Sequence, residues 1–175
     1  PLLEAIRPFV TCDVPDSRIV AEPSERFPGG ILSYPYLRGR SMLPEDVNSA
    51  NRGSLASGLG KFLAELHSIP FDRLAALETR PSLSSRAEHE SIREETSQIV
   101  AAQLNVDEFN NLDSWWDQLL SDSHMQDFPV SMTHQDMWSD NLLVDGDPLA
   151  LLAVIDWEYA RFGDPAVDFV GLSYL

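Results

Sequence analysis

Three side chains in the last third of the sequence have the types and spacing of a metal-assisted catalytic site. Asp136 and Asn141 are five residues apart, and Asp156 follows after a further fifteen. Apolar runs at 142–144 and 149–155 flank turn-forming residues at 145–148, a pattern that predicts a β-hairpin. Because an antiparallel hairpin brings its two outer ends together, we expect Asn141 and Asp156 to lie at the same end.

One amide and one carboxylate suit Mg²⁺, which prefers oxygen ligands and usually keeps waters or substrate phosphates in its remaining positions. We therefore predict that Asn141 and Asp156 bind Mg²⁺, with capping of the strand ends as the alternative. On the preceding loop, the Asp136 carboxylate can hydrogen-bond a substrate hydroxyl that attacks a metal-held phosphate. The alternative for Asp136 is an exposed aspartate that caps a turn. We predict that His134 orders this loop by hydrogen bonding rather than transferring protons.

The segments that must position these residues are short strands and longer helices. Apolar periodicity and turn residues predict the end of an amphipathic helix at 2–10, strands at 18–21 and 30–37 joined as a hairpin, a helix at 54–69, and helices at 86–103 and 110–120. Trp115 and Trp116 in the last helix are interpreted as packing residues. Because the strands are segregated from the helices, the sequence predicts an α+β fold.

Two further aspartates stand in the segment Gly163-Asp164-Pro165-Ala166-Val167-Asp168, a turn that leads into a final helix. Carboxylates at such positions cap helix N-termini and tie loops together. We therefore predict that Asp164 and Asp168 support the loop that carries Asp136. The other histidines show no partner pattern and are interpreted as structural or solvated: His67, His89 and His124.

Three linked motifs carry a resemblance to a known family. His134-x-Asp136-x-x-x-x-Asn141, Ile155-Asp156-Trp157-Glu158 and the Gly163–Asp168 segment closely resemble the aminoglycoside phosphotransferase and choline kinase-like group. The fold of that group is similar to protein kinases. The resemblance implies transfer of the terminal phosphate of ATP or GTP to a small-molecule hydroxyl, with Asp136 as the base and Mg²⁺ held by Asn141 and Asp156.

The resemblance continues upstream of these motifs. The segment 63–70, Leu-Ala-Glu-Leu-His-Ser-Ile-Pro, looks like the long helix of the kinase C-lobe. Residues 31–39 resemble the strand and hinge between the two lobes, with Tyr34 as gatekeeper. This implies that the Pro35 carbonyl accepts a hydrogen bond from the adenine amino group and that the Leu37 N–H donates one to the ring. The implied division is a partial N-lobe at 1–37 and a helical C-lobe at 38–175.

Two parts of such a kinase are expected outside this sequence. A Gly-rich hairpin covers the phosphates in these enzymes, and a strand lysine pairs with them. Both are expected before Pro1, because Lys61, the only lysine, falls in the helix at 54–69. The last helices, which shape the acceptor pocket, are expected after Leu175. We therefore expect part of a longer kinase that transfers phosphate poorly by itself, with a non-catalytic kinase-like binding module as the alternative.

Composition excludes other classes of protein. Acidic residues number 28 against 12 basic ones, a formal charge of −16, so nucleic acid is disfavoured as a partner. The charge suits a cationic acceptor, or serves only solubility. No apolar run is long enough to cross a membrane, and the single cysteine, Cys12, fits a cytoplasmic location. A hydrolase is disfavoured because there is neither a Gly-x-Ser-x-Gly nor a His-Glu-x-x-His motif.

Overall fold

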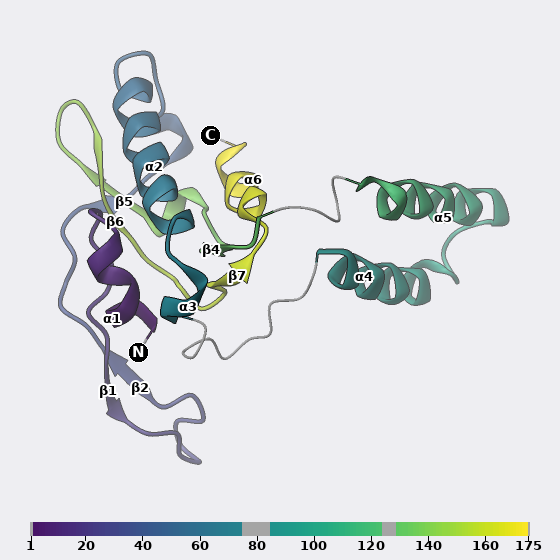
Figure 1. Ribbon diagram of the computed structural model, residues 1–175, viewed down its shortest axis with the longest axis horizontal. Helices are drawn as coiled ribbons and strands as arrows, with labels where there is room; N and C mark the ends of the chain where they lie inside the picture. The colour runs from purple at the N-terminus through teal and green to yellow at the C-terminus, as the bar shows by residue number, and fades with distance from the viewer. Residues whose placement is uncertain (1, 75–84, 124–128, 175) are drawn as a thin grey trace. The chain divides into compact units, whose positions relative to one another are not determined.

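The computed structural model describes residues 2–74, 85–123 and 129–174 (Figure 1). Its helices, 3-10 turns and strands follow one another as α1 (Leu2–Ile6), η1 (Arg7–Phe9), β1 (Arg18–Ala21), β2 (Ile31–Ser33), β3 (Arg40–Ser41), η2 (Pro44–Asp46), α2 (Arg52–His67), α3 (Phe71–Leu74), α4 (Ser85–Val100), α5 (Val106–Ser121), β4 (Ser131–Thr133), η4 (Ser139–Asn141), β5 (Leu142–Asp145), β6 (Ala150–Val154), β7 (Arg161–Gly163), η5 (Pro165–Val167) and α6 (Asp168–Leu172). The strands form small antiparallel sheets beside the helices, which confirms the α+β prediction. His124 lies outside the described residues.

The chain forms two compact units. One contains residues 1–80 together with 131–175, and the other contains residues 81–130. All three predicted site motifs fall in the first unit. The predicted boundary between lobes at residue 37 is not tested by this grouping and stays a prediction. Among the described helices, none has the length and apolar character needed to cross a bilayer.

A three-stranded sheet with the order β3-β5-β6 organises the first unit. The predicted hairpin is confirmed as β5 and β6, in which Leu142 is opposite Val154. Asp13 extends the sheet beyond β6, because its N–H donates to Leu152 O and its carbonyl accepts from Val154 N. The sheet therefore has a partner along both sides of the hairpin.

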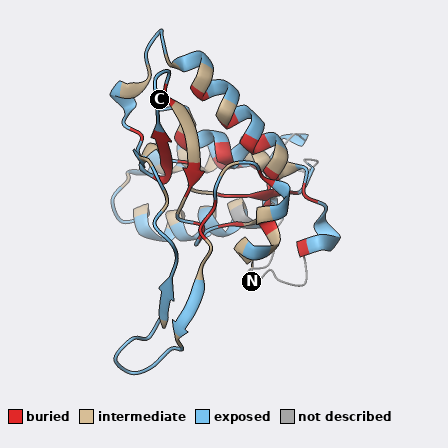
Figure 2. Ribbon diagram, turned by 90° about the vertical axis from the view of Figure 1, so that its left-hand side faces the viewer, coloured by how far each residue is buried: buried red, intermediate tan, exposed pale blue. Residues whose placement is uncertain are grey.

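The core of this unit lies between the sheet and the predicted long helix. That helix is present as α2, and its apolar face is buried as the spacing predicts: Leu55, Leu59, Phe62, Leu63 and Leu66. In Figure 2 the buried positions, drawn in red, fall on the core strands and on one side of the helices, whereas the β1–β2 hairpin is pale blue. Leu142, Val144 and Val154 of the hairpin are completely buried. Burial of these side chains fixes the hairpin's register, because a one-residue slip would turn them toward water.

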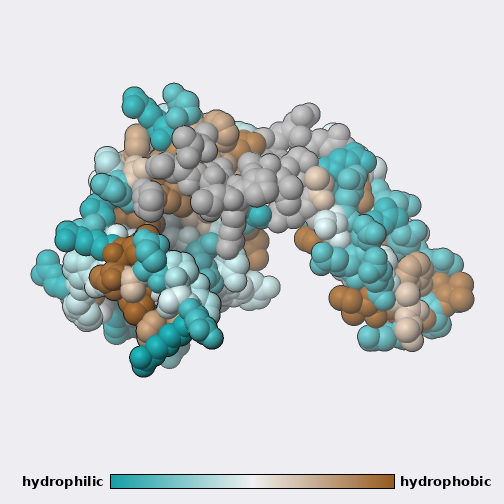
Figure 3. Space-filling view, turned by 90° about the horizontal axis from the view of Figure 1, so that it is seen from below, coloured by the Kyte–Doolittle hydropathy of each residue, from teal (hydrophilic) through white to brown (hydrophobic). Residues whose placement is uncertain are grey.

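The second predicted strand is shorter than expected. Residues 31–33 form β2, which pairs antiparallel with β1, whereas residues 34–37 are not strand. Pro35 has no N–H to donate to a ladder, which accounts for the early end. This hairpin exposes apolar side chains, with Ile19, Val20 and Leu32 more than half exposed. Figure 3, which views the molecule from below, shows hydrophobic residues gathered on this side of the first unit.

In the described part of the second unit, residues 85–123, the helices α4 and α5 contact each other. Asn105 begins α5 by accepting hydrogen bonds from the N–H groups of Asp107 and Glu108, an arrangement that satisfies donors otherwise unpaired in the first turn. Trp116 is buried as predicted, whereas Trp115 is half exposed, its ring 4.8 Å from that of Trp116. Helix α4 ends three residues earlier than predicted, and α5 begins four residues earlier, at the Asn105 cap that the apolar periodicity does not reveal.

Candidate active site

Asp136 and Asn141 lie in direct contact at the start of the hairpin. The Asn141 Nδ2 donates to Asp136 Oδ2 at 2.8 Å and to the Asp136 carbonyl oxygen at 2.9 Å. Asn141 is buried at the end of η4, and Asp136 is half-buried. The loop that joins them, residues 134–141, is closed further by the Trp138 N–H, which donates to the Asp136 carbonyl at 2.9 Å.

These two hydrogen bonds determine which way the Asn141 amide faces. Both acceptors are oxygens of Asp136, so the amide nitrogen must be turned toward them. The amide oxygen is therefore directed away from Asp136 and keeps its lone pairs for another partner. An oxygen in that position has the chemistry of a ligand for a hard cation such as Mg²⁺.

Asp156 lies at the same end of the hairpin as Asn141. The N–H of the preceding residue, Ile155, donates to the Asn141 carbonyl at 3.0 Å, which extends the ladder by one pair. Asp156 itself is exposed and has a φ of 65°. A positive φ is uncommon outside glycine, and aspartate is among the residues that tolerate it. The expectation that the hairpin brings residues 141 and 156 together is confirmed.

His134 connects the 134–141 loop to the strand that leads to Asp156. Its Nδ1 accepts from the Asp136 N–H at 3.3 Å, and its Nε2 lies 3.0 Å from the Ile155 carbonyl oxygen. An acceptor at one ring nitrogen and a donor at the other describe a neutral imidazole. Burial lowers the pKa of His134, an effect that the nearby carboxylates, Asp168 first, partly oppose. The ring packs edge-on against Trp157 at 4.6 Å.

The buried carboxylate of Asp168 holds the loop from the opposite side. It accepts from the His134 N–H at 3.0 Å and from the Gln135 N–H at 2.7 Å. Its other oxygen lies 2.9 Å from Nε2 of His67, the last residue of α2. Gln135 has a φ of 72°, the second positive φ outside glycine, so the loop is held in an uncommon backbone conformation. Two main-chain N–H groups and the His67 ring thus provide this buried carboxyl group with the partners that its burial requires.

Asp164 has a local partner. Its side chain accepts from the Ala166 N–H at 2.9 Å and begins η5, the 3-10 turn that leads directly into α6. This is the capping arrangement that the sequence predicts for a carboxylate before a helix.

The described residues include no larger metal-binding cluster. Within 2–74, 85–123 and 129–174, no three His, Cys, Asp or Glu side chains are grouped closely enough to hold a metal ion. An amide and one carboxylate fit a Mg²⁺ that takes its remaining ligands from water and phosphate, as the predicted pair Asn141 and Asp156 requires.

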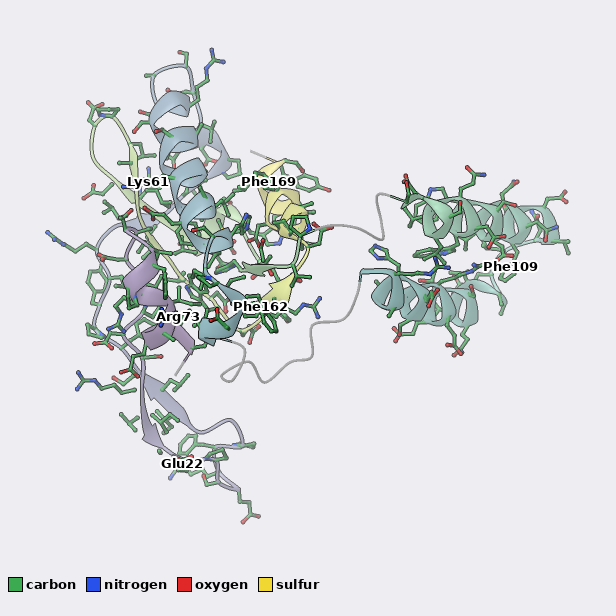
Figure 4. The ribbon with its side chains drawn as sticks, viewed as in Figure 1. Glu22, Lys61, Arg73, Phe109, Phe162 and Phe169 are labelled. Atoms are coloured by element: carbon green, nitrogen blue, oxygen red, sulfur yellow. The ribbon has the colours of Figure 1, made fainter. Side chains whose placement is uncertain are left out.

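The residues predicted to form the hinge follow β2, and the single lysine lies on α2. Pro35 is exposed and Leu37 half-buried, in the segment that follows β2. Lys61 lies on α2, where it is labelled in Figure 4, with its Nζ 3.8 Å from Glu65. Glu65 also accepts from the Thr11 N–H at 2.8 Å, and the Lys61 side chain is 63% exposed, so this lysine lies on the surface of α2.

Sequence reasoning did not assign His67 or Gly171 to the site, although His67 contacts the predicted support Asp168 and Gly171 contacts the loop. His67 and Asp168 are 101 positions apart, so no local spacing relates them. Gly171 in α6 lies against the loop backbone: a Cβ there would be 2.5 Å from the Met137 carbonyl oxygen. A glycine inside a predicted helix is the one available signal, because it destabilises a helix by about 1 kcal/mol relative to alanine and so suggests a packing reason.

Solved structures resemble this chain along nearly its whole length. The GDP and kanamycin complex of APH(2")-IIia matches with a TM-score of 0.84 and 18% identity, covering 98% of this chain and 58% of that one. The streptomycin-ATP-APH(2")-IIa ternary complex matches with a TM-score of 0.76 and 20% identity, covering 98% and 58%. Macrolide 2'-phosphotransferase MphH from Brachybacterium faecium matches with a TM-score of 0.71 and 25% identity, covering 96% and 55%.

One curated relative matches over a shorter part. Acyl-CoA dehydrogenase family member 11 of Mus musculus is 27% identical over 127 residues, which are 73% of this chain and 16% of that protein. The chain thus spans little more than half the length of the solved structures above, and about a sixth of the mouse protein.

The structural likenesses show that the chain has the kinase-like fold of these phosphotransferases. The family model described as "Phosphotransferase enzyme family" matches residues 2–175 and therefore includes all three motifs of the site. With the resemblance seen in the sequence, the fold and the family model in agreement, the chain belongs to the phosphotransferase enzyme family.

Proposed function

We propose that this chain carries the catalytic and metal-binding loops of a small-molecule kinase, which transfers the terminal phosphate of ATP or GTP to a hydroxyl. The observation that carries the proposal is the contact of the Asn141 amide nitrogen with the Asp136 carboxylate, at the hairpin end shared with Asp156. This contact leaves one carboxylate oxygen of Asp136 for a substrate and the amide oxygen of Asn141 for a cation.

Asp136 is proposed as the base. The acceptor hydroxyl donates its hydrogen bond to the Asp136 carboxylate, and its oxygen attacks the terminal phosphorus of the nucleotide. The bond from that phosphorus to the bridging oxygen breaks, the nucleoside diphosphate leaves, and the hydroxyl proton passes to Asp136. Position matters more than basicity in this reaction, because catalysis rests mainly on orientation and charge neutralisation.

Mg²⁺ is proposed to bind to the Asn141 amide oxygen and the Asp156 carboxylate. When bound, it supplies positive charge that neutralises the phosphate oxygens as they react. His134, Asp164 and Asp168 are proposed to hold the loop in place through the hydrogen bonds described above.

The nucleotide base is proposed to bind at the hinge. The Pro35 carbonyl would accept a hydrogen bond from the base and the Leu37 N–H would donate one, so that a proline at position 35 is tolerated. The proposed acceptor is a small hydroxylated molecule, and the formal charge of −16 favours a cationic one. Similar proteins bind kanamycin or streptomycin, and one is a macrolide phosphotransferase, which suggests the first acceptors to test.

A cytoplasmic location is part of the proposal. ATP and GTP are cytoplasmic co-substrates, and the single Cys12 has no cysteine within this sequence to form a disulfide with.

A non-catalytic kinase-like binding module is the second candidate. The observation in its favour is Lys61, the only lysine of the sequence, which lies near Glu65 on α2 rather than at the site. Such a module would bind a nucleotide without transferring its phosphate. Nucleotide binding and phosphate transfer therefore have to be measured separately.

The first experiment is isothermal titration of Mg²⁺-ATP, and separately Mg²⁺-GTP, into the 175-residue chain and an Asp156→Asn variant. Loss of a metal ligand should weaken Mg²⁺-nucleotide affinity at least about tenfold. Asp147→Asn removes the same charge from the exposed turn of the hairpin and should leave the affinity unchanged. Equal affinities for all three proteins would refute the metal site.

The second experiment measures phosphate transfer to kanamycin, a macrolide and choline. Asp136→Asn keeps the shape of the side chain but removes the base, so transfer should fall roughly 10²–10⁴-fold. Asp147→Asn again serves as the control. Transfer that persists in Asp136→Asn would refute the assigned base, and nucleotide binding without transfer in the unmodified chain would favour the binding module.

A further inference from the structure

We infer that Gly171 is a positioning residue, whose missing side chain allows α6 to hold the 134–141 loop against the helix backbone. A Cβ at position 171 would lie 2.5 Å from the Met137 carbonyl oxygen, 2.8 Å from its carbonyl carbon and 3.1 Å from the Trp138 nitrogen. All three atoms belong to the main chain, so no side chain can rotate away to make room. Even alanine would force the loop and the helix apart.

The contact at Gly171 is one of two that α6 makes with this loop. Asp168 lies three residues earlier, on the same face of the helix, and accepts from the N–H groups of His134 and Gln135. The carboxylate thus holds the two residues before Asp136, and the bare glycine backbone abuts the two residues after it. One face of α6 therefore contacts the loop both before and after Asp136.

These contacts of α6 on both sides of Asp136 determine where its carboxylate points. The Asp136 N–H donates to the His134 ring, and its carbonyl accepts from both Trp138 and Asn141, so Asp136 has little freedom of its own within the loop. A displacement of residues 137 and 138 by a Cβ at Gly171 must therefore pass to Asp136 or break these bonds. A misplacement of about 1 Å can lower a catalytic rate roughly 100-fold.

The inference rests on the proposed function only for its effect on catalysis, since the contact itself can be tested without activity. Hydrogen exchange of the 131–142 peptide reports whether the loop is held. We expect Gly171→Ala to raise amide exchange in this peptide at least about tenfold. Gly60→Ala, in α2, is the matched control because a Cβ there meets nothing within 4 Å; it should leave this peptide unchanged and stabilise its helix. Unchanged exchange in folded Gly171→Ala would overturn the inference.

Kinetics separate positioning from a general loss of structure. In an active enzyme, Gly171→Ala should lower kcat about 100-fold while KM for the Mg²⁺-nucleotide changes little, because Asn141 and Asp156 are held mainly by the hairpin. An unchanged kcat with an intact proposed base would refute positioning while leaving the proposed function standing. If the unmodified chain transfers no phosphate but Gly171→Ala still loosens the 131–142 peptide, the proposed kinase activity fails and the structural role of Gly171 is retained.

A second variant covers the case in which Gly171→Ala does not fold. Asp168→Asn keeps the side-chain shape but weakens the other contact between α6 and the loop, because a neutral oxygen accepts these hydrogen bonds less strongly than a carboxylate. Exchange should rise first in residues 134–138 and only later in α6 itself. Simultaneous exchange of both segments would mean that α6 does not hold the loop, and would overturn the inference.

Discussion

At the scale of single residues, the neutral form of His134 links the two halves of the site. Nδ1 accepts from the Asp136 N–H while Nε2 donates to the Ile155 carbonyl, one residue before Asp156. A proton added to Nδ1 would leave two donors facing each other at Asp136. Protonation of this imidazole therefore loosens the connection between the proposed base and the proposed metal ligand.

This arrangement makes stability depend on pH. Burial lowers the pKa of His134 in the folded chain below the value of about 6.5 expected when unfolded. Between these two pKa values the unfolded chain binds a proton that the folded chain does not, so the free energy of unfolding falls as the pH falls through this window. The contribution of His134 is fully present above about pH 7 and is lost progressively below it.

The check is urea denaturation of the unmodified chain and His134→Asn between about pH 8 and about pH 5. The variant should be less stable at the upper end, and the difference between the two proteins should narrow toward the lower end. As the control, His89→Asn in α4 should show the same dependence of the free energy of unfolding on pH as the unmodified chain. A difference that stays constant across the range would contradict a buried, neutral His134.

At the scale of elements, the β5–β6 hairpin carries the site because its interior is apolar and fully packed. Leu142 is completely buried directly after Asn141, and its opposite residue, Val154, precedes Asp156 by two positions. The same side chains that hold the hairpin in register thus determine the separation of the two proposed ligands. A substitution that loosens the packing of the hairpin core is therefore expected to weaken Mg²⁺ binding as well.

Leu142→Ala is predicted to lower the free energy of unfolding by about 2–5 kcal/mol, through lost burial and the cavity left behind. Leu32→Ala removes the same atoms from an exposed position in β2 and should stay within about 0.5 kcal/mol of the unmodified chain. Urea denaturation gives both values. A small effect at Leu142 would mean that the hairpin core relaxes around the gap and does not fix the separation of the ligands.

Elements with a long periodic pattern could be predicted from the sequence, as could the four-residue strand β1, whereas strands of two or three residues were missed or given wrong bounds. The helix α2 and the β5–β6 hairpin are within two residues of their predicted bounds, since several apolar positions define each. The strands β3, β4 and β7 contain two or three residues and were not predicted. So few residues show no alternation, and their strand conformation arises from pairing with partners distant in sequence, as between β4 and β7.

At the scale of the whole molecule, the site also contains parts that the sequence predicts and parts that depend on tertiary packing. Asp136, Asn141 and Asp156 could be brought together by one hairpin, which the sequence predicts. The support behind them comes from two other elements: His67 ends α2, and both Asp168 and Gly171 belong to α6. The role of Asp168 is predicted from its turn motif, and a glycine in a predicted helix is the only local signal for Gly171. The contact of His67 depends on tertiary packing, which local spacing does not reveal.

The division into two units predicts that a substitution in one unit raises hydrogen exchange in that unit only. Arg93 of α4 forms ion pairs with Asp113 and Asp117 of α5, so it joins the two helices of the 81–130 unit. Arg93→Gln should raise hydrogen exchange in α4 and α5 while the 131–142 peptide keeps its protection. Arg86→Gln is the control, because Arg86 pairs with Glu90 within its own helix. Faster exchange of the 131–142 peptide in Arg93→Gln would contradict independent units.

Asp13 gives the sheet a further property, which is mechanical. Two main-chain hydrogen bonds fix Asp13 to Leu152 and Val154, and the β1–β2 hairpin follows a few residues later. The segment before β1 cannot be displaced unless both bonds break or β6 moves with it. β6 ends two residues before Asp156. A pulling force on the segment that contains Asp13 is therefore expected to act on β6 through these main-chain hydrogen bonds, and so on the position of a proposed metal ligand.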